Sequence, residues 1–372
     1  MTLIIIEIVI VLIGLAVTPV LFYHFPRLPE TSSRNGHFPT ISVIIPARNE
    51  EKNLSLLLKD LHTQSAAPFE IICVDDESSD STAQIAESYG VKVLSLHDKP
   101  QGWTGKSWAC QNGANAAKGE LLLFLDADVR LEHNGILRLM EAYSDCNCTI
   151  SVQPFHKTET AYEQFSMLFN FIQIAANGTA LPNPLGVGLY GPVILISKSD
   201  YNKIGGHESV KQSIVEDMAL GARLKEVGIP YMLFAGDKDI SFRMYGDGLK
   251  GLLQGWIKNM AAGALKTPPH VLGMVFFWIT SLISVPLHVI SFAVSGNILW
   301  MLIYSLLYII WVSLLRFYSK RIGKFLFWAI AFYPILMVGF LLIFAVSVFK
   351  KVFGLKVIWK GRAIAEEENP CE

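Results

Sequence analysis

The sequence lacks an excess of charge of either sign. Its 31 basic and 32 acidic residues leave a formal net charge of −1 at pH 7. A nearly neutral chain sets up no overall field that would attract nucleic acid. We therefore expect no nucleic-acid partner.

Cysteine is also scarce, with five residues in a chain of 372. The cysteines are scattered and odd in number, and their spacing matches no zinc-binding pattern. A disulfide framework needs an even, regularly spaced set, so we expect reduced thiols in a cytosolic domain. The five residues are Cys73, Cys110, Cys146, Cys148 and Cys371.

The sequence also lacks internal repeats and low-complexity tracts. It shows no Ser-His-Asp or Cys-His arrangement for nucleophilic catalysis. The apolar stretch over residues 3–23 has no basic region before it and no small-residue cleavage site after it. A secretory signal peptide has both. Residues 1–24 are therefore predicted to form an uncleaved membrane anchor.

Apolar residues, in contrast, make up 52% of the chain, and the mean hydropathy is +0.39. Three further apolar stretches cover residues 271–294, 298–315 and 325–349. Each approaches or exceeds the length that crosses about 30 Å of hydrocarbon. The four stretches together predict a multi-pass protein of the cell membrane, with C-terminal membrane segments over residues 269–350.

Basic residues flank the apolar stretches, which favours a cytoplasmic location for those loops. Three full crossings after a cytoplasmic block would place the basic tail, residues 351–372, outside the cell. We therefore expect the tail to be cytoplasmic and one segment not to cross, and we predict a re-entrant hairpin at 325–349, where Tyr333-Pro334 interrupts the stretch. The basic loop residues are Arg27, Arg34, Arg316, Lys320, Arg321 and Lys324, and those at the C-terminal end are Lys350, Lys351, Lys356, Lys360 and Arg362.

The polar block over residues 36–268 alternates strand-like and helix-like patterns. This alternation predicts an α/β domain with a mostly parallel sheet and right-handed crossovers. A later apolar segment, 161–180, is expected either to pack on the sheet or to lie at the membrane interface beside an acceptor groove. The expected strands cover 41–45, 70–74, 91–94 and 121–125; the expected helices cover 51–61, a capped segment ending near Tyr89, and 106–118, closed by Gly119.

Polar clusters follow the ends of these strands. Asp126-Ala127-Asp128 comes directly after the apolar run 121–125. The carboxyl ends of parallel strands open onto the crevice where α/β sheets bind ligands. Two carboxylates one residue apart can hold Mg²⁺ or Mn²⁺ there against a diphosphate, because both ions prefer oxygen ligands.

Three more clusters point to the same crevice. Residues 43–50 leave the first strand, 74–80 leave the second, and 215–221 open a later helix. Each alone is also compatible with an ordinary turn or helix cap. Together they outline a nucleotide pocket, in which Arg48 or Lys106 can face phosphate.

These motifs, in this order, resemble those of family 2 glycosyltransferases with a GT-A fold. The matching pieces are Ile-Pro-Ala-Arg-Asn-Glu from Ile45, Val-Asp-Asp-Glu-Ser-Ser-Asp from Val74, Asp-Ala-Asp from Asp126, and Glu-Asp at 216–217. The resemblance implies a Rossmann-like, mostly parallel sheet domain flanked by N- and C-terminal transmembrane helices. It also implies inverting transfer of a hexose from a UDP-sugar.

The resemblance assigns roles residue by residue. Pro46, Arg48 and Glu50 are expected to line the uridine side, and Asp75 or Asp76 to contact uracil or ribose. Asp128 is expected to bind the metal and the diphosphate, with Asp126 toward the donor ribose or sugar. Asp217 is the expected general base.

The sequence departs from the family pattern in two places. Glu77 stands where glycine is usual, so that turn is expected to differ. Gln254-Gly255-Trp256 lacks the arginine of the Gln-x-x-Arg-Trp motif that many processive relatives carry. This second departure argues against a processive polysaccharide synthase.

A narrower similarity extends over nearly the whole chain, membrane ends included. Segments such as residues 105–110, 151–156 and 359–362 resemble glycosyltransferases of staphylococcal carotenoid synthesis. This implies a membrane-bound enzyme, glucose as the sugar, and a lipid-like acceptor such as the carboxylate of a C30 carotenoid. The alternative acceptors are a hopanoid, a ceramide, a diacylglycerol or a polyprenyl phosphate. The alternative to an enzyme is an inactive nucleotide-sugar sensor.

Overall fold

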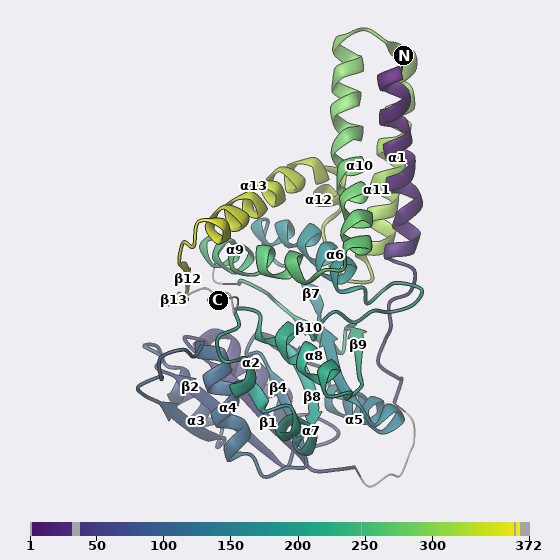
Figure 1. The fold of residues 1–372 in the computed structure, drawn as a ribbon. Coiled ribbons are helices and arrows are strands. Elements are labelled where there is room, and N and C mark those ends of the chain that lie inside the picture. Colours follow the sequence, from purple (N-terminus) through teal and green to yellow (C-terminus); the bar gives the residue numbers. More distant parts are fainter. Residues whose placement is uncertain (1, 32–37, 247, 361, 365–372) are drawn as a thin grey trace.

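The structure is a computed structural model that describes residues 2–31, 38–246, 248–360 and 362–364. Figure 1 shows a sheet domain at one end, upright helices at the other, and a layer of crosswise helices between them. The predicted α/β class is confirmed. Arg34 and Cys371 lie outside the described residues.

The described strands form a seven-stranded sheet in the order β3-β2-β1-β4-β8-β6-β9. β8 runs antiparallel to β4 and β6, whereas the other neighbouring pairs are parallel. The central β1 and β4 are buried along nearly their whole length, as expected for a sheet covered on both faces. The strands are β1 (Ile41–Ala47), β2 (Glu70–Asp76), β3 (Lys92–Leu96), β4 (Leu121–Leu125), β6 (Thr149–Gln153), β8 (Val193–Ser197) and β9 (Tyr231–Ala235).

Helices cover both faces of this sheet because successive strand residues point to opposite sides. Val43 and Ile45 pack in one core with α2, α3 and α5, whereas Ile44 packs in another with α4, α7 and α8. The predicted helix over 51–61 is confirmed. The helices are α2 (Glu51–His62), α3 (Thr82–Ser88), α4 (Gly105–Ala116), α5 (Gly135–Cys146), α7 (Lys198–Lys203) and α8 (Glu216–Glu226), with a 3₁₀ turn η2 (Gly206–Val210).

A smaller sheet connects this domain to the membrane-side helices. Its order is β11-β7-β10-β5. Gly323 of β11 pairs with His156 of β7, so the loop after α11 is held against the sheet domain. The strands are β5 (Val129–Leu131), β7 (Phe155–Lys157), β10 (Ile240–Phe242) and β11 (Gly323–Lys324).

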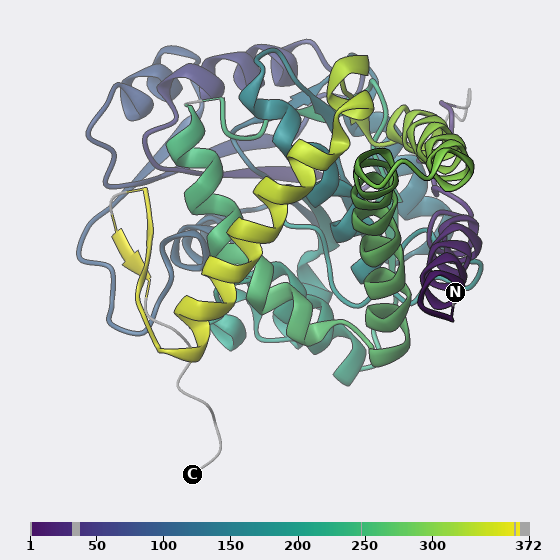
Figure 2. The same cartoon turned by 90° about the horizontal axis from the view of Figure 1, so that it is seen from above.

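Three apolar helices stand side by side at the far end. They are α1 (Thr2–Leu21), α10 (Pro269–Val294) and α11 (Ile298–Ser319), seen upright in Figure 1 and nearly end-on in Figure 2. Twenty helical residues extend about 30 Å, the thickness of the hydrocarbon core. By length and composition, α10, α11 and α13 (Tyr333–Val352) could cross a membrane, and α1 adds a shorter apolar stretch, Ile5–Leu21.

The segment 325–349, which we predicted to form a re-entrant hairpin, folds as a short helix followed by a long one. The break before Pro334 exists, but it separates the short α12 (Phe327–Ala331) from α13, a continuous helix of 20 residues. α13 lies across the direction of α10 and α11, beside α9 (Leu249–Lys266) (Figures 1 and 2). Pro334 sits in the first turn of α13, where a missing N–H costs no helical hydrogen bond.

The apolar segment 161–180 forms η1 (Tyr162–Phe165) and α6 (Ser166–Asn177). Phe169 and Phe171 are fully buried in the core that also holds Trp256 and Trp278 of α9 and α10. α6 therefore lies beneath the membrane-side helices rather than on an open interface.

Two local predictions are wrong. α4 ends at Ala116 rather than at a left-handed Gly119; Gly119 instead lies where a side chain would collide with the backbone of Ser42. Cys146 and Cys148 are joined by a disulfide, whereas we expected free thiols. The left-handed Asn147 between them turns the chain sharply enough to bring the two Cα atoms to 5.2 Å.

Candidate active site

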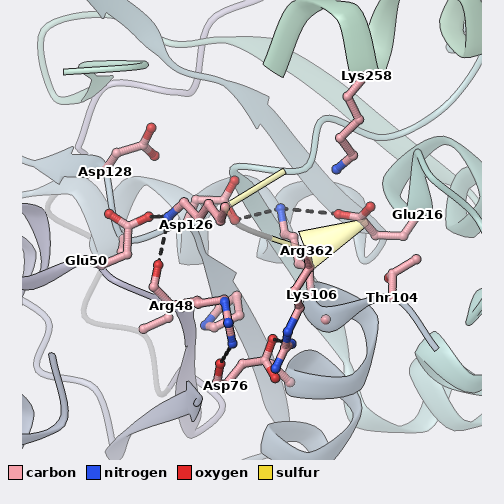
Figure 3. Close-up of a pocket in the computed structure, with 16 residues that line it drawn as sticks. Arg48, Glu50, Asp76, Thr104, Lys106, Asp126, Asp128, Glu216, Lys258 and Arg362 are labelled. Carbon is pink, nitrogen blue, oxygen red and sulfur yellow. Dashed lines mark hydrogen bonds and ion pairs between the residues drawn. The ribbon is translucent and has the colours of Figure 1, made fainter. Parts of the chain in front are cut away.

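The strand-end motifs meet at one cavity, as predicted. It encloses about 970 Å³ of empty space, part of it open to solvent. The ends of β1, β2 and β4 form one side, and the first turns of α4 and α8 form another (Figure 3). The charged lining residues are Arg48, Lys106, Lys258, Lys360 and Arg362 with Glu50, Asp76, Asp126, Asp128 and Glu216; Pro46, Ala47, Thr104, Gly105, Ala109 and Ala127 complete the wall.

The turns after β1 and β2 hold each other in place. Asn49 donates from its N–H to Ser78 Oγ (2.9 Å) and accepts at its side-chain oxygen from the N–H of Ser79 (2.8 Å). Arg48 donates to the carbonyl oxygen of Asp76. Glu77 adopts the left-handed conformation, with φ of 55°. The turn therefore keeps the backbone geometry that favours glycine, although the residue is glutamate.

The two neighbouring aspartates of β2 point to different surroundings. Asp76 lines the cavity, whereas Asp75 is not among its lining residues and accepts from the N–H of Ser78 (3.4 Å). Each keeps one buried Oδ1 that has no hydrogen-bond partner among the described residues. A buried acceptor of this kind is costly unless a donor meets it, so Asp76, which lies on the cavity wall, suits a ligand rich in N–H or O–H groups.

The first turn of α4 supplies positive charge to the cavity. Thr104 caps the helix by accepting from the N–H of Ser107 (3.3 Å). Lys106 Nζ lies 2.6 Å from Asp126 and 3.4 Å from Glu216. Burial favours the neutral amine, but these two carboxylates outweigh it and raise the pKa of Lys106 well above its ordinary value. Helix N-termini favour anions, so this wall suits phosphate.

Asp126 and Asp128 lie on the wall nearest to Glu50. Burial, together with the charges of Asp126 and Glu50, raises the pKa of Asp128 to about 8. Crowded carboxylates of this kind are stabilised by a cation, and oxygen ligands suit Mg²⁺ or Mn²⁺. The described residues contain no group of three or more metal-ligating side chains. The donor set therefore fits a metal that takes its remaining ligands from water and a diphosphate.

Asp217 lies beside the cavity rather than on its wall, whereas its neighbour Glu216 lines it. Both oxygens of Asp217 are held by backbone N–H groups, Oδ1 by its neighbour Met218 and Oδ2 by Gly191, each at 2.8 Å. Burial and the charge of Glu216 raise the pKa of Asp217 to about 6, against the opposing effects of Lys106, the Met218 N–H and Lys258. A carboxylate with this pKa can accept a proton near neutral pH.

Gly191 is the residue that allows this approach. A Cβ at this position would lie 2.9 Å from Asp217 Oδ2 and 3.2 Å from Lys106 Nζ. Gly191→Ala is therefore expected to displace both side chains and to lower kcat at least tenfold, and the displacement of Lys106 from the wall that suits phosphate should also weaken donor binding. Gly273→Ala, on α10 and outside the cavity lining, is the matched control, because its Cβ meets nothing within 4 Å. Steady-state kinetics that show equal activity for both variants would contradict the positioning role of Gly191.

The last described residues reach back to the same cavity. A two-stranded hairpin, β12 (Val357–Trp359) with β13 (Arg362–Ile364), follows α13. Lys360 pairs with Glu50 and donates to the carbonyl oxygen of Arg48 (3.0 Å), and Arg362 Nη1 lies 2.6 Å from Asp76 Oδ2. We name residues 357–364 the C-terminal hairpin. In the sequence, Lys360 and Arg362 indicate membrane topology, and only the similarity of residues 359–362 to related glycosyltransferases points to a role at the site.

The C-terminal hairpin supplies two of the cations on the side of the cavity formed by the turns after β1 and β2. Replacing both Lys360 and Arg362 with glutamine is expected to raise the donor KM at least tenfold, because a diphosphate loses two positive neighbours. Lys350→Gln with Lys356→Gln removes the same charge outside the cavity and serves as the control. Equal donor KM values for the two double variants would show that the hairpin cations do not act on the donor.

Two buried histidines have structural roles. His156 and His207 are buried and lie outside the cavity wall. His156 bonds to Asn170 (2.9 Å) and His207 to the Tyr201 hydroxyl (2.8 Å). Burial lowers their pKa values to about 4 and about 3, so both rings are neutral.

The family model described as glycosyl transferase family 2 matches residues 42–205. Over 374 residues, 97% of this chain and 98% of the relative, the sequence is 32% identical to the 4,4'-diaponeurosporenoate glycosyltransferase of Staphylococcus aureus (strain N315). The chain belongs to glycosyltransferase family 2. This family 2 glycosyltransferase is also 36% identical over 336 residues, 87% of its length and 88% of the relative's, to the enzyme of the same name from Staphylococcus haemolyticus.

A solved structure supports the fold of this family 2 glycosyltransferase. A mannosyltransferase from Pyrobaculum calidifontis, in complex with GDP-Man and Mn²⁺, aligns with a TM-score of 0.53 over 92% of this chain and 99% of its own. The two sequences are 13% identical, so the likeness concerns the fold. The predicted GT-A fold and glycosyltransferase activity are both confirmed.

Proposed function

We propose that this glycosyltransferase moves a hexose, expected to be glucose, from a UDP-sugar to the carboxylate of a C30 carotenoid acid in the cell membrane. The observation that carries the proposal is the nearly full-length similarity to enzymes named for 4,4'-diaponeurosporenoate. The apolar helices beside the cavity support it, because such an acceptor dissolves in a bilayer rather than in water.

The nucleotide side of the cavity is assigned to uridine diphosphate. Pro46, Arg48 and Glu50 follow β1 there, and Asp76 lines the floor with its unmet Oδ1. Asp126 and Asp128 would hold Mg²⁺ or Mn²⁺. When bound, this cation neutralises charge that develops on the departing diphosphate. Lys106 and the N–H groups in the first turn of α4 would stabilise the negative charge of the same diphosphate.

The reaction follows as a single displacement with inversion. One oxygen of the acceptor carboxylate forms a bond to the anomeric carbon, while the bond from that carbon to the diphosphate oxygen breaks and its electron pair leaves with UDP. A carboxylic acid with an ordinary pKa near 4 is already ionised at neutral pH. No proton therefore has to be removed, and Asp217 and Gly191 contribute mainly by fixing the reacting side of the cavity.

The membrane arrangement is assigned from the helix directions. α1, α10 and α11 would cross the bilayer, whereas α13 would lie along its surface above the sheet domain. The C-terminal hairpin then stays on the cytoplasmic side with the catalytic cavity, in keeping with its contacts to Glu50 and Asp76.

A reporter fused after Glu372 is expected to show cytoplasmic activity in intact cells. The physical reason is the contact of Lys360 and Arg362 with the sheet domain, together with the basic residues that precede them. The matched fusion after Asn297, between α10 and α11, is expected to report the opposite side. Equal reporter signals from the two fusions would contradict this topology.

The function is tested with the purified full-length protein in lipid nanodiscs. The expected result is transfer from radiolabelled UDP-glucose to the carotenoid acid, giving a product that dilute alkali cleaves, because a glycosyl ester is base-labile and a glycoside is not. A product from a hopanoid or ceramide that survives alkali, or a diacylglycerol product from which alkali releases glycosylglycerol rather than the free sugar, would replace the proposed acceptor. Absence of sugar transfer to any of these, with UDP-sugar still bound, would instead support a sensor.

A further inference from the structure

One cation of the cavity comes from the membrane-side layer. Lys258 lies on α9 and lines the cavity opposite the turns after β1 and β2 (Figure 3). The neighbouring part of α9 packs against α13: the N–H of Ala261 donates to Ser347 Oγ (3.0 Å), and that hydroxyl donates to the carbonyl oxygen of Ile257 (2.6 Å). Lys258 is therefore fixed between the apolar layer and the reacting groups.

The side chains of α8 on which the charge of Lys258 acts are acidic. This charge acts on both Glu216 and Asp217, where it favours the ionised carboxylate. Glu216 is also paired with Lys106, which is in turn paired with Asp126. Lys106 therefore already forms ion pairs with two carboxylates. A third anion on this side would need another cation to balance its charge.

Charge balance makes that need concrete. Five cationic and five anionic side chains line the cavity. Bound UDP-sugar adds the negative charge of a diphosphate, which a divalent cation offsets. An ionised acceptor carboxylate then adds one more negative charge beside Glu216 and Asp217. Neighbouring like charges repel strongly in a partly buried site. An alcohol acceptor adds no charge and would not meet this repulsion.

The position of Lys258 also suits an acceptor that arrives from the membrane. Leu265 lies two helical turns further along the same face of α9 and is 73% exposed. Gly251, two turns earlier on that face, has no atom within 4 Å of where a side chain would start. An apolar chain lying along α9 would therefore bring its charged end to Lys258.

We infer that Lys258 binds the carboxylate of the acceptor and makes this glycosyltransferase selective for acidic over alcoholic lipid acceptors. The inference rests on the proposed function. It assigns Lys258 to the acceptor, whereas Lys360 and Arg362 stand on the donor side. The diphosphate is the other anion that could meet Lys258, and the experiment separates the two.

The test compares wild type, Lys258→Met, Lys258→Arg and Lys250→Met in nanodiscs. Methionine keeps the length of the side chain without its charge, and Lys250 is an exposed control on the same helix. Each protein is assayed with the carotenoid acid and with the corresponding carotenoid alcohol, and UDP binding in the presence of Mn²⁺ confirms the folded state.

Lys258→Met is expected to raise the KM for the acid at least tenfold and to lower the acid-to-alcohol ratio of kcat/KM by a similar factor. Lys258→Arg should restore most of that ratio, and Lys250→Met should leave it unchanged. An unchanged ratio, or a donor KM that rises as much as the acid KM, overturns the assignment. A wild-type enzyme that rejects the acid altogether overturns the proposed function, and the inference with it.

Discussion

Replacing Asp128 with asparagine is expected to abolish sugar transfer while the protein still folds. The neutral amide cannot match a carboxylate as a ligand for Mg²⁺ or Mn²⁺, so calorimetry should show that metal-dependent UDP binding is lost. The effect on activity should reach at least a thousandfold, because the metal contributes several kcal/mol to stabilising the departing diphosphate.

Stability separates this effect from misfolding. Burial and the charges of Asp126 and Glu50 raise the pKa of Asp128 to about 8, so without metal its carboxyl is largely neutral near pH 7 and a neutral amide should leave the melting temperature nearly unchanged. Asp98→Asn is the control, since Asp98 is exposed and already left-handed, a conformation that asparagine tolerates. Normal metal-dependent UDP binding by Asp128→Asn would refute the metal assignment.

The second large effect is expected at Asp217, and its size depends on the acceptor. An alcohol must lose a proton as it attacks, so Asp217→Asn should lower kcat about 10²–10⁴-fold with an alcohol acceptor. With a carotenoid acid, no proton is removed and a substantial part of the activity should remain. The activity of Asp217→Asn with the acid should still be lower than that of the wild type. The amide NH₂ of asparagine must face one of the two N–H donors that now hold the carboxylate.

The pH profile of the unmodified enzyme tests the same point without a mutation. The pKa of Asp217 is raised to about 6 by burial and Glu216, with Lys106 and Lys258 opposing. Its carboxylate is therefore protonated progressively as the pH falls through 6. With an alcohol acceptor, kcat/KM should fall about tenfold per pH unit below that point. With the carotenoid acid, whose own pKa is near 4, the fall between pH 6 and 5 should be much smaller. Identical profiles for the two acceptors would contradict this division of roles.

Much of the donor side could be predicted because parallel strands end at one edge of a sheet. Arg48, Asp76 and Asp126 each follow a strand with a clear apolar pattern, and the pattern alone brings them together. The choice between Asp75 and Asp76 could not be made in this way. It depends on which side of β2 faces α4. Asp76 is on that side, so close to Gly105 that a Cβ there would lie 2.5 Å from Asp76 Oδ2.

Other features of the site and the fold could not be predicted from the sequence, most of them because they depend on contacts between distant segments. Lys258 reaches the cavity only because α9 is held by α13 and α6, and no periodicity in residues 249–266 indicates that face. The crosswise direction of α13 is equally hidden, since its apolar composition is the same as that of a crossing helix. The Cys146–Cys148 disulfide depends on the left-handed turn at Asn147, a local backbone choice that composition does not indicate.

The C-terminal hairpin has a consequence for how the enzyme becomes active during synthesis. The donor cavity receives Lys360 and Arg362 only after α10, α11 and α13 have been made, since the hairpin follows them along the chain. A ribosome that has completed the sheet domain has therefore not completed the cavity. With the membrane arrangement proposed above, insertion into the bilayer would precede full donor binding, so the enzyme would acquire its capacity to use the proposed UDP-sugar where the proposed lipid acceptor is dissolved. A sheet domain produced on its own for crystallisation would lack both cations, and so would underestimate the affinity of the intact protein for its donor.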